Sequence, residues 1–240
     1  MTTDSSTGTV LSPAALAHVV LRTSQYEPMV AFYKAFLGAH ATYENESLSF
    51  LTYDDEHHRV AILHVPSAKP RDPTSAGMAH MAFTFNTLKD LLLAYRQRKA
   101  RGIVPIWAVN HGPTTSMYYQ DPDGNQIETQ VDNFETVEQA NASMNTPEFA
   151  ENPIGVDYDP EDLIRRIENG EDEGCLKKRP RIGPRGLEGV PRSAFKPTVM
   201  EPATDQMLEL FRILCTRMAR IDLVYVYHTK IILDDWVAAK

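Results

Sequence analysis

The sequence has 240 residues, of which 42% are hydrophobic and 23% are charged. This composition is typical of a globular chain with one sizeable core or two small ones, and it excludes a mini-protein. The formal net charge of −8 disfavours a nucleic-acid partner, because an excess of carboxylates repels phosphate groups. The two cysteines, Cys175 and Cys215, lie far apart in the sequence, so neither a disulfide framework nor a cysteine zinc site is indicated.

The first residues carry no targeting signal that we recognise. Residues 1–13 are rich in Thr and Ser, contain no basic region and are expected to form a flexible N-terminus. No run of apolar residues approaches the length needed to cross a membrane. We therefore expect a cytoplasmic protein with no membrane partner, and the scarcity of cysteine fits a reducing compartment.

Two parts of the chain repeat each other. The strand-like segments around His18 and His80 have similar sequences, Ala-His-Val-Val and Ala-His-Met-Ala, so the two histidines occupy equivalent positions. Each segment is followed at a similar offset by an amphipathic helix and then by about three further strand-like stretches. The repeat therefore predicts an α+β domain over residues 14–135, made of paired βαβββ units at 14–68 and 77–135.

The ends of the two predicted helices are recognisable. Ser24 and Thr87 are expected to cap the N-termini, and Gly38 and Gly102 are expected to end the helices. The Asp-Gly pair within residues 121–125 predicts a hairpin turn before the last strand of the second unit.

The character of the chain changes after residue 135. Residues 136–194 are polar and rich in proline, and we interpret them as a linker that contains a short helix. Residues 195–240 are expected to form a partly helical, apolar tail. An apolar stripe at helical spacing in this tail is interpreted as core or as a dimer contact, which leaves a homodimer open.

A carboxylate on the last strand of the second unit completes a candidate metal site. Glu128 lies on that strand, and His18 and His80 lie at matched positions on the first strands. Each of these residue types is more often structural when it occurs alone, but the three in matched positions are a much rarer combination. Two imidazoles and one carboxylate leave three adjacent positions open, as is typical of non-haem Fe(II) enzymes that bind substrate and dioxygen together.

This double unit, with ligands on its first and last strands, resembles the vicinal oxygen chelate superfamily. That superfamily includes glyoxalases, fosfomycin and bleomycin resistance proteins, and extradiol catechol dioxygenases. The resemblance covers about residues 14–135. It implies that the units form an open, barrel-like cavity in which the metal is held by His18, His80 and Glu128.

Within this superfamily the chain resembles the extradiol dioxygenases of the biphenyl-2,3-diol type. The resemblance of residues 50–62 implies that His58, the second of two adjacent histidines, is the catalytic acid/base. Tyr118, ten residues before Glu128, matches the catalytic tyrosine of these enzymes. His111 lies two residues from the position of a further family histidine and is predicted as a catalytic or pocket residue. The substrate pocket is expected to include His57, His111 and Tyr118.

The resemblance implies a Fe(II)-dependent oxidoreductase of aromatic compound metabolism, which cleaves the ring of a catechol-type diol with O2. A metal-dependent isomerase, lyase or glyoxalase-like enzyme using Mn, Ni or Zn is an alternative, and so is a metal-free binding or resistance protein. Glyoxalase-type members use a fourth ligand from the first unit, where alignment of Asp54 with Asp121 puts Ala61 opposite Glu128, and the nearby substitute, His64, lies three residues further along. This favours a site with three ligands, which suits oxygen chemistry.

Overall fold

The computed structural model describes residues 10–72 and 75–191. The chain divides into two compact units, Met1–Thr198 and Val199–Lys240, and all described residues lie in the first of them. The apolar tail that we expect at 195–240 lies outside the described residues.

The first half of the domain is a four-stranded sheet with one helix. Its elements are β1 (Val19–Thr23), α1 (Tyr26–Leu37), β2 (His40–Glu44), β3 (Leu48–Thr52) and β4 (Val60–His64). The strand order is β1-β4-β3-β2. Strand β1 pairs parallel to β4, and the other pairs are antiparallel, so the first and last strands of the unit are neighbours.

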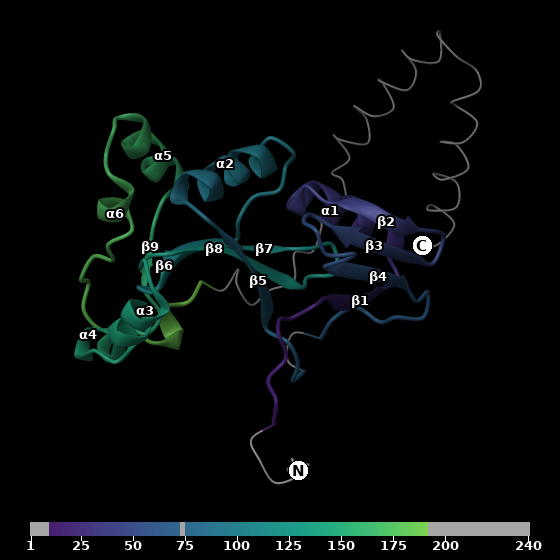
Figure 1. The fold of residues 1–240 in the computed structure, drawn as a ribbon, viewed down its shortest axis with the longest axis horizontal. Helices are drawn as coiled ribbons and strands as arrows, with labels where there is room; N and C mark the ends of the chain where they lie inside the picture. Colours follow the sequence, from purple (N-terminus) through teal and green to yellow (C-terminus); the bar gives the residue numbers. More distant parts are fainter. Residues whose placement is uncertain (1–9, 73–74, 192–240) are drawn as a thin grey trace, which may run out of the picture. The chain divides into compact units, whose positions relative to one another are not determined.

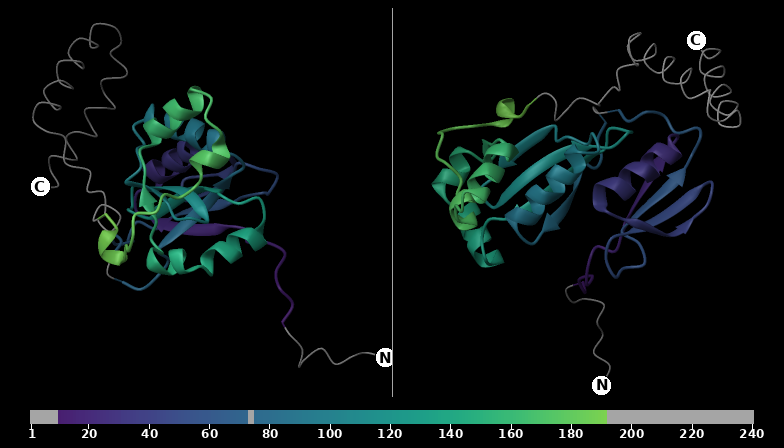
Figure 2. Two further views of the ribbon diagram at one scale, coloured as in Figure 1. Left: turned by 90° about the vertical axis from the view of Figure 1, so that its left-hand side faces the viewer. Right: turned by 90° about the horizontal axis from the view of Figure 1, so that it is seen from above.

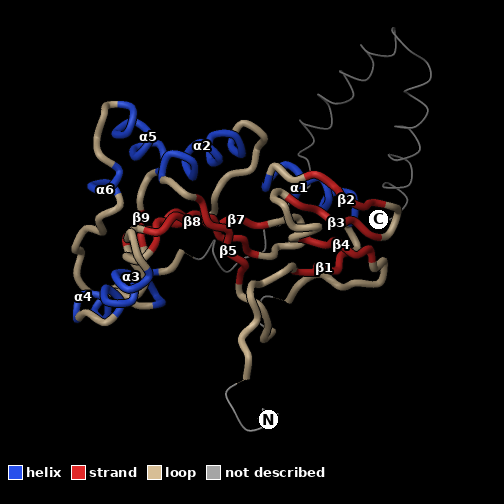
Figure 3. Tube along the Cα trace, in the orientation of Figure 1, coloured by secondary structure: helices blue, strands red, loops and turns tan. Residues whose placement is uncertain are grey.

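The second half repeats this arrangement. Its elements are β5 (His80–Phe85), α2 (Leu88–Lys99), β6 (Trp107–Asn110), β7 (Thr114–Gln120) and β8 (Gln126–Asp132). Strand β5 pairs parallel to β8, and β7 lies antiparallel between β8 and β6 (Figure 3). The two βαβββ units predicted from the repeat are thereby confirmed, and both sheets are open rather than closed barrels.

Helix α1 covers one face of the first sheet, and α2 covers one face of the second (Figure 2). In β1, Leu21 is buried and Val20 is exposed, because successive side chains of a strand point to opposite faces. The buried face of the second sheet includes Met81, Tyr119 and Ile127.

The predicted helix ends are confirmed in part. Thr87 caps α2 by accepting a hydrogen bond from the Asp90 backbone N, and Gly38 ends α1 in the left-handed conformation with φ 64°. Ser24 is not the N-cap of α1. The N-cap is Gln25, whose side chain makes no cap hydrogen bond. Its backbone N donates instead to the hydroxyl of Thr23.

The segment that we expect to be a linker, 136–194, is instead part of the second half where it is described. It contains α3 (Val137–Met144), α4 (Pro147–Glu151), β9 (Val156–Asp157), α5 (Pro160–Glu168), α6 (Glu173–Leu176) and a 3-10 turn at Leu187–Gly189. Strand β9 extends the second sheet by pairing with β6. Leu163 and Ile164 of α5 and Leu176 of α6 join the core, whereas α3 and α4 bury none of their residues.

Helix α5 packs beside α2 over the same sheet (Figure 1). The hydroxyl of Tyr95 in α2 donates to Glu161 of α5, and Lys99 forms an ion pair with the same carboxylate. None of the helices in the described part of the chain is long and apolar enough to span a membrane.

Candidate functional site

Glu128 lies at the centre of the candidate site. It is on β8, between Tyr118 of β7 and Ala82 of β5, and its neighbours in sequence point to the helix-covered face. Its side chain is only 6% exposed, and Oε2 lies 3.0 Å from Nε2 of His80. The second sheet thus brings two of the three predicted metal ligands into direct contact.

The surroundings of Glu128 favour its charged form. Burial raises the pKa of this carboxyl group, but hydrogen bonds from His80 and Ser116, together with the charge that His80 can carry, lower the pKa below its usual value. Ser116 is fully buried and lies on the neighbouring strand. Glu128 is therefore an anionic oxygen donor at neutral pH, which is what a divalent metal requires.

His18 lies on the first half, immediately before β1, and is exposed. His18 and His80 both border a cavity of about 380 Å³, whose wall also includes Tyr53, Met78 and Phe83. Within residues 10–72 and 75–191, no three His, Cys, Asp or Glu side chains lie close enough together to form a ready metal site. The donor chemistry fits a divalent metal, with His80 and Glu128 in contact and His18 on the same cavity.

His58 is held among aromatic rings. Its ring stacks on Phe50, with centroids 4.4 Å apart, and lies 4.2 Å from the ring centroid of His18. Burial lowers the pKa of His58, and the nearby His18 and His57 lower it further. His58 is therefore a neutral imidazole at pH 7, able to accept a proton.

His57 is the more exposed member of the adjacent pair. Its ring lies 4.4 Å from that of His58, and the Nδ1 atoms of the two residues are in contact. Nε2 of His57 lies 3.1 Å from Oε1 of Glu56. The sequence-based interpretation of His58 as the reactive member and His57 as a pocket residue thus remains a prediction, with a physical basis in their different burial.

Tyr118 and His111 form a second polar pair on the second sheet. The Tyr118 hydroxyl lies 2.9 Å from Nε2 of His111, and the Tyr118 ring meets the ring of His80 edge to face. Burial is the main cause of the raised pKa of Tyr118, and the Glu128 carboxylate adds to it, so the phenol stays protonated. Burial also lowers the pKa of His111, although the hydrogen bond to the Ile154 carbonyl opposes this.

The structure distinguishes Tyr118 from its neighbour Tyr119. Tyr119 points to the opposite face of β7, is fully buried and packs edge-on against Phe36, with ring centroids 5.0 Å apart. Only Tyr118 therefore lies beside Glu128.

Trp107 is a neighbour of the site that no motif in the sequence indicates. This residue lies opposite Tyr118 in the pairing of β6 with β7, and its ring stacks on the Tyr118 ring at 5.1 Å. It also meets the ring of His111 edge to face. Counting outward from a turn at 111–114 would have placed Trp107 opposite Tyr118, because residues pair symmetrically about a hairpin turn.

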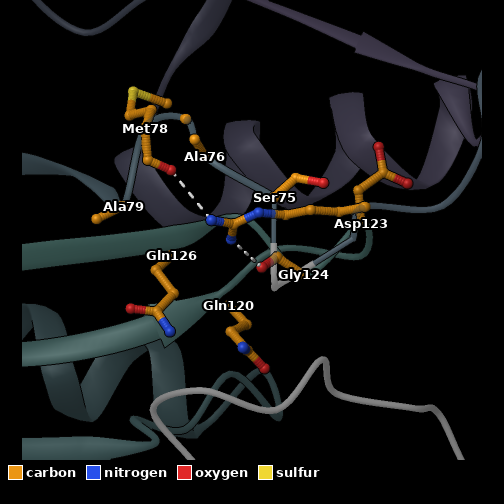
Figure 4. A pocket seen from close by; sticks show the side chains of 10 residues that line it. Ser75, Ala76, Met78, Ala79, Gln120, Asp123, Gly124 and Gln126 are labelled. Carbon is orange, nitrogen blue, oxygen red and sulfur yellow. Dashed lines mark hydrogen bonds between the residues drawn. The ribbon is translucent and has the colours of Figure 1, made fainter.

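A separate polar cavity of about 310 Å³ lies next to the turn before β8 (Figure 4). The Arg71 guanidinium beside it donates to the carbonyl groups of Gly124 and Met78. None of the predicted site residues lines this cavity.

Comparison with known proteins relates the chain to one family. Residues 15–129 match the family described as the glyoxalase/bleomycin resistance protein/dioxygenase superfamily. Biphenyl-2,3-diol 1,2-dioxygenase 2 of Rhodococcus globerulus is 54% identical over 145 residues, which cover 60% of this chain and 76% of the relative.

A second relative and a solved structure extend the comparison. Biphenyl-2,3-diol 1,2-dioxygenase 3 of the same organism is 45% identical over 166 residues, which cover 68% of this chain and 87% of the relative. The chain in the crystal structure of lactoylglutathione lyase from Agrobacterium tumefaciens is 17% identical, and the match covers 50% of this chain and 94% of that chain. The TM-score of this match is 0.41.

Proposed function

Because the chain belongs to the glyoxalase/bleomycin resistance protein/dioxygenase superfamily, we propose that it is an extradiol dioxygenase. In this proposal it cleaves the ring of a catechol-type aromatic diol with O2 and uses Fe(II) as its cofactor. The two Rhodococcus globerulus relatives support this reaction, since both are named as biphenyl-2,3-diol dioxygenases.

The observation that carries the proposal is the contact between His80 and the buried Glu128 carboxylate, at 3.0 Å, beside Tyr118. A carboxylate in this position is held in its charged form and directed at an imidazole, which suits a metal ligand. The protonated phenol next to it can donate a hydrogen bond to a substrate oxygen.

We assign His18, His80 and Glu128 as the residues that would hold Fe(II). When bound, the metal would supply Lewis-acid binding of the diol and activation of dioxygen. Mn, Ni and Zn also accept this donor set, so metal content is part of the test.

Two side chains of the protein, His58 and Tyr118, would accept a proton from the diol and donate a hydrogen bond to it. The neutral His58 imidazole is suited to accept a proton from a diol hydroxyl, because burial and its histidine neighbours lower its pKa. The Tyr118 hydroxyl would donate a hydrogen bond to an oxygen of the substrate and so stabilise charge that develops there. Phe50, stacked on His58, holds that imidazole in place.

The full chain, loaded anaerobically with Fe(II), tests the proposal when it is mixed with aerated catechol and 2,3-dihydroxybiphenyl. We expect oxygen uptake and a yellow ring-cleavage product. Absence of both across a broad panel of diols would reject the dioxygenase assignment. Metal analysis of protein purified without added metal separates the alternatives, because Mn, Ni or Zn would indicate an isomerase or lyase, and metal-free protein would indicate a binding protein.

A further inference from the structure

Part of the segment that follows β8 contacts a residue of the candidate site. Nδ1 of His111 lies 2.5 Å from the backbone carbonyl oxygen of Ile154, which belongs to the turn before β9. A carbonyl can only accept a hydrogen bond, so Nδ1 of His111 carries the proton. In the neutral ring Nε2 is then an acceptor, and it lies 2.9 Å from the Tyr118 hydroxyl.

We propose that residues 152–185 are part of the active site, in which the Ile154 carbonyl holds His111 in the tautomer that accepts a hydrogen bond from Tyr118. His111 then directs the Tyr118 hydroxyl proton away from Glu128. This inference rests on the proposed function, since it gives the segment a positioning role in the same site.

The tautomer matters because Tyr118 has one proton and two acceptors. Its hydroxyl lies 2.9 Å from Nε2 of His111, and Tyr118 is the residue opposite Glu128 in the pairing of β7 with β8. With the proton of His111 on Nε2, the imidazole would donate to Tyr118 and the Tyr118 proton would turn to Glu128. The lone pairs of that carboxylate would then be engaged by a neighbour instead of being available to a metal.

The turn that presents Ile154 is tightly built. The side chain of Asn152, which is 5% exposed, accepts from the backbone N of Gly155 at 2.7 Å and donates to its carbonyl at 3.2 Å. Gly155 has φ +110°, and a Cβ there would clash with the backbone O of Asn110, so only glycine fits. Nη1 of Arg179 donates to the carbonyls of Asn152 and His111, at 2.7 and 3.0 Å.

The same segment also fixes the ring that stacks on Tyr118. Nε1 of Trp107 donates to Asp157 of β9 at 2.7 Å. Arg185 holds the Asp157 carboxylate through two contacts of 2.8 and 3.0 Å. Residues 152–185 therefore contact two of the rings that lie against Tyr118, those of His111 and Trp107, from a single turn and strand.

Nitrogen-15 NMR of the metal-free full chain, labelled at histidine, tests the tautomer without depending on activity. The His111 signals are identified by their loss in His111→Gln. Asn152→Ala removes the side chain that shapes the turn and touches no reacting group. Asn145→Ala is the matched control, because Asn145 is exposed and bonds only within its own helix end.

We expect His111 of the wild type and of Asn145→Ala to carry its proton on Nδ1, and we expect this preference to be lost in Asn152→Ala. After anaerobic loading with Fe(II) and desalting, Asn152→Ala should retain less iron than the wild type and Asn145→Ala, because Tyr118 would then engage Glu128, and its kcat per chain should fall roughly 10-fold or more. A wild-type proton on Nε2, or an unchanged tautomer in Asn152→Ala, would overturn the inference. If the tautomers behave as expected but no variant turns over a diol, the proposed function fails and the positioning role of the segment stands.

Discussion

Nε of Arg98 donates to the backbone carbonyl of Phe36 at 2.8 Å, so a side chain of the second half caps a helix of the first half. Phe36 lies in the last turn of α1, where carbonyl groups have no partner within the helix. The guanidinium also lies over the Phe36 ring, 3.9 Å from its centroid. This contact joins the halves that carry His18 and His80, and it thereby helps hold the two walls of the candidate site together.

A substitution at Arg98 should therefore lower the free energy of unfolding more when it removes more side-chain volume. Arg98→Ala opens a cavity and leaves the Phe36 carbonyl unpaired, so we expect the free energy of unfolding to fall by about 3 kcal/mol. Arg98→Met keeps most of the packing and removes a buried cation whose Nη1 finds no partner in the described residues, so we expect a loss of about 1 kcal/mol. Urea unfolding measures both, and equal losses would contradict this account.

A second contact between the halves should be sensitive to pH. The Tyr33 hydroxyl donates to the buried Asp121 carboxylate at 3.0 Å. Burial raises the pKa of Asp121, while this hydrogen bond lowers it. Tyr33→Phe should cost roughly 1.5 to 3 kcal/mol at pH 7, where Asp121 is charged.

The sign of the pH effect follows from which form of Asp121 the hydroxyl stabilises. Tyr33 favours the charged form, so its contribution is present above the folded-state pKa of Asp121 and is lost as pH falls through it. Because the pKa of Asp121 is raised above 3.8, the loss of unfolding free energy caused by Tyr33→Phe should become smaller as pH falls toward about 4. If the loss of unfolding free energy in Tyr33→Phe is the same at pH 7 and at about pH 4, the hydroxyl of Tyr33 does not stabilise the charged Asp121 carboxylate.

Removal of the Glu128 carboxylate should abolish tight iron binding. Glu128→Ala deletes the charged donor that contacts His80, and two imidazoles alone bind Fe(II) weakly. Iron content after anaerobic loading and desalting measures the effect. Glu135→Ala, which removes an exposed carboxylate beyond β8, should keep the wild-type iron content. Iron retained by Glu128→Ala would refute the proposed ligand set.

His58 should be needed for turnover rather than for metal binding. His58→Gln keeps a polar side chain of similar reach but cannot accept a full proton, so kcat should fall roughly 10²- to 10⁴-fold with iron content unchanged. His40→Gln is the matched control, since His40 is an exposed histidine of β2. Steady-state oxygen uptake measures both variants, and wild-type turnover in His58→Gln would remove His58 from the mechanism.

The neighbouring tyrosines offer a matched pair. Tyr118→Phe removes the hydroxyl that contacts His111, and we expect kcat to fall roughly 10²-fold with bound iron retained. Tyr119→Phe alters the opposite face of the same strand, so it should leave kcat unchanged and affect only stability. Similar losses of turnover in the two variants would mean that the hydroxyl of Tyr118 has no specific role.

Local features of the sequence were enough to predict the repeated unit and the ends of several of its elements. The repeat around His18 and His80 predicted two βαβββ units, and Thr87 and Gly38 marked helix ends as expected. These features depend on residues near one another in the chain, because caps, turns and hydrophobic periodicity act over a few positions. The choice of His18, His80 and Glu128 as a metal set followed from equivalent places in the repeat and stays a prediction.

Which of Tyr118 and Tyr119 faces the site became clear from the three-dimensional structure alone. Alternation along a strand places adjacent side chains on opposite faces of the sheet, but it does not say which face a helix covers. The structure also decided that residues 156–176 belong to the second half and that Ile154 and Trp107 lie against His111. The physical reason is that these contacts join segments far apart in the chain. They form because β9 pairs with the edge of the second sheet and the apolar edges of short polar helices are buried against it, and no local pattern specifies either partner.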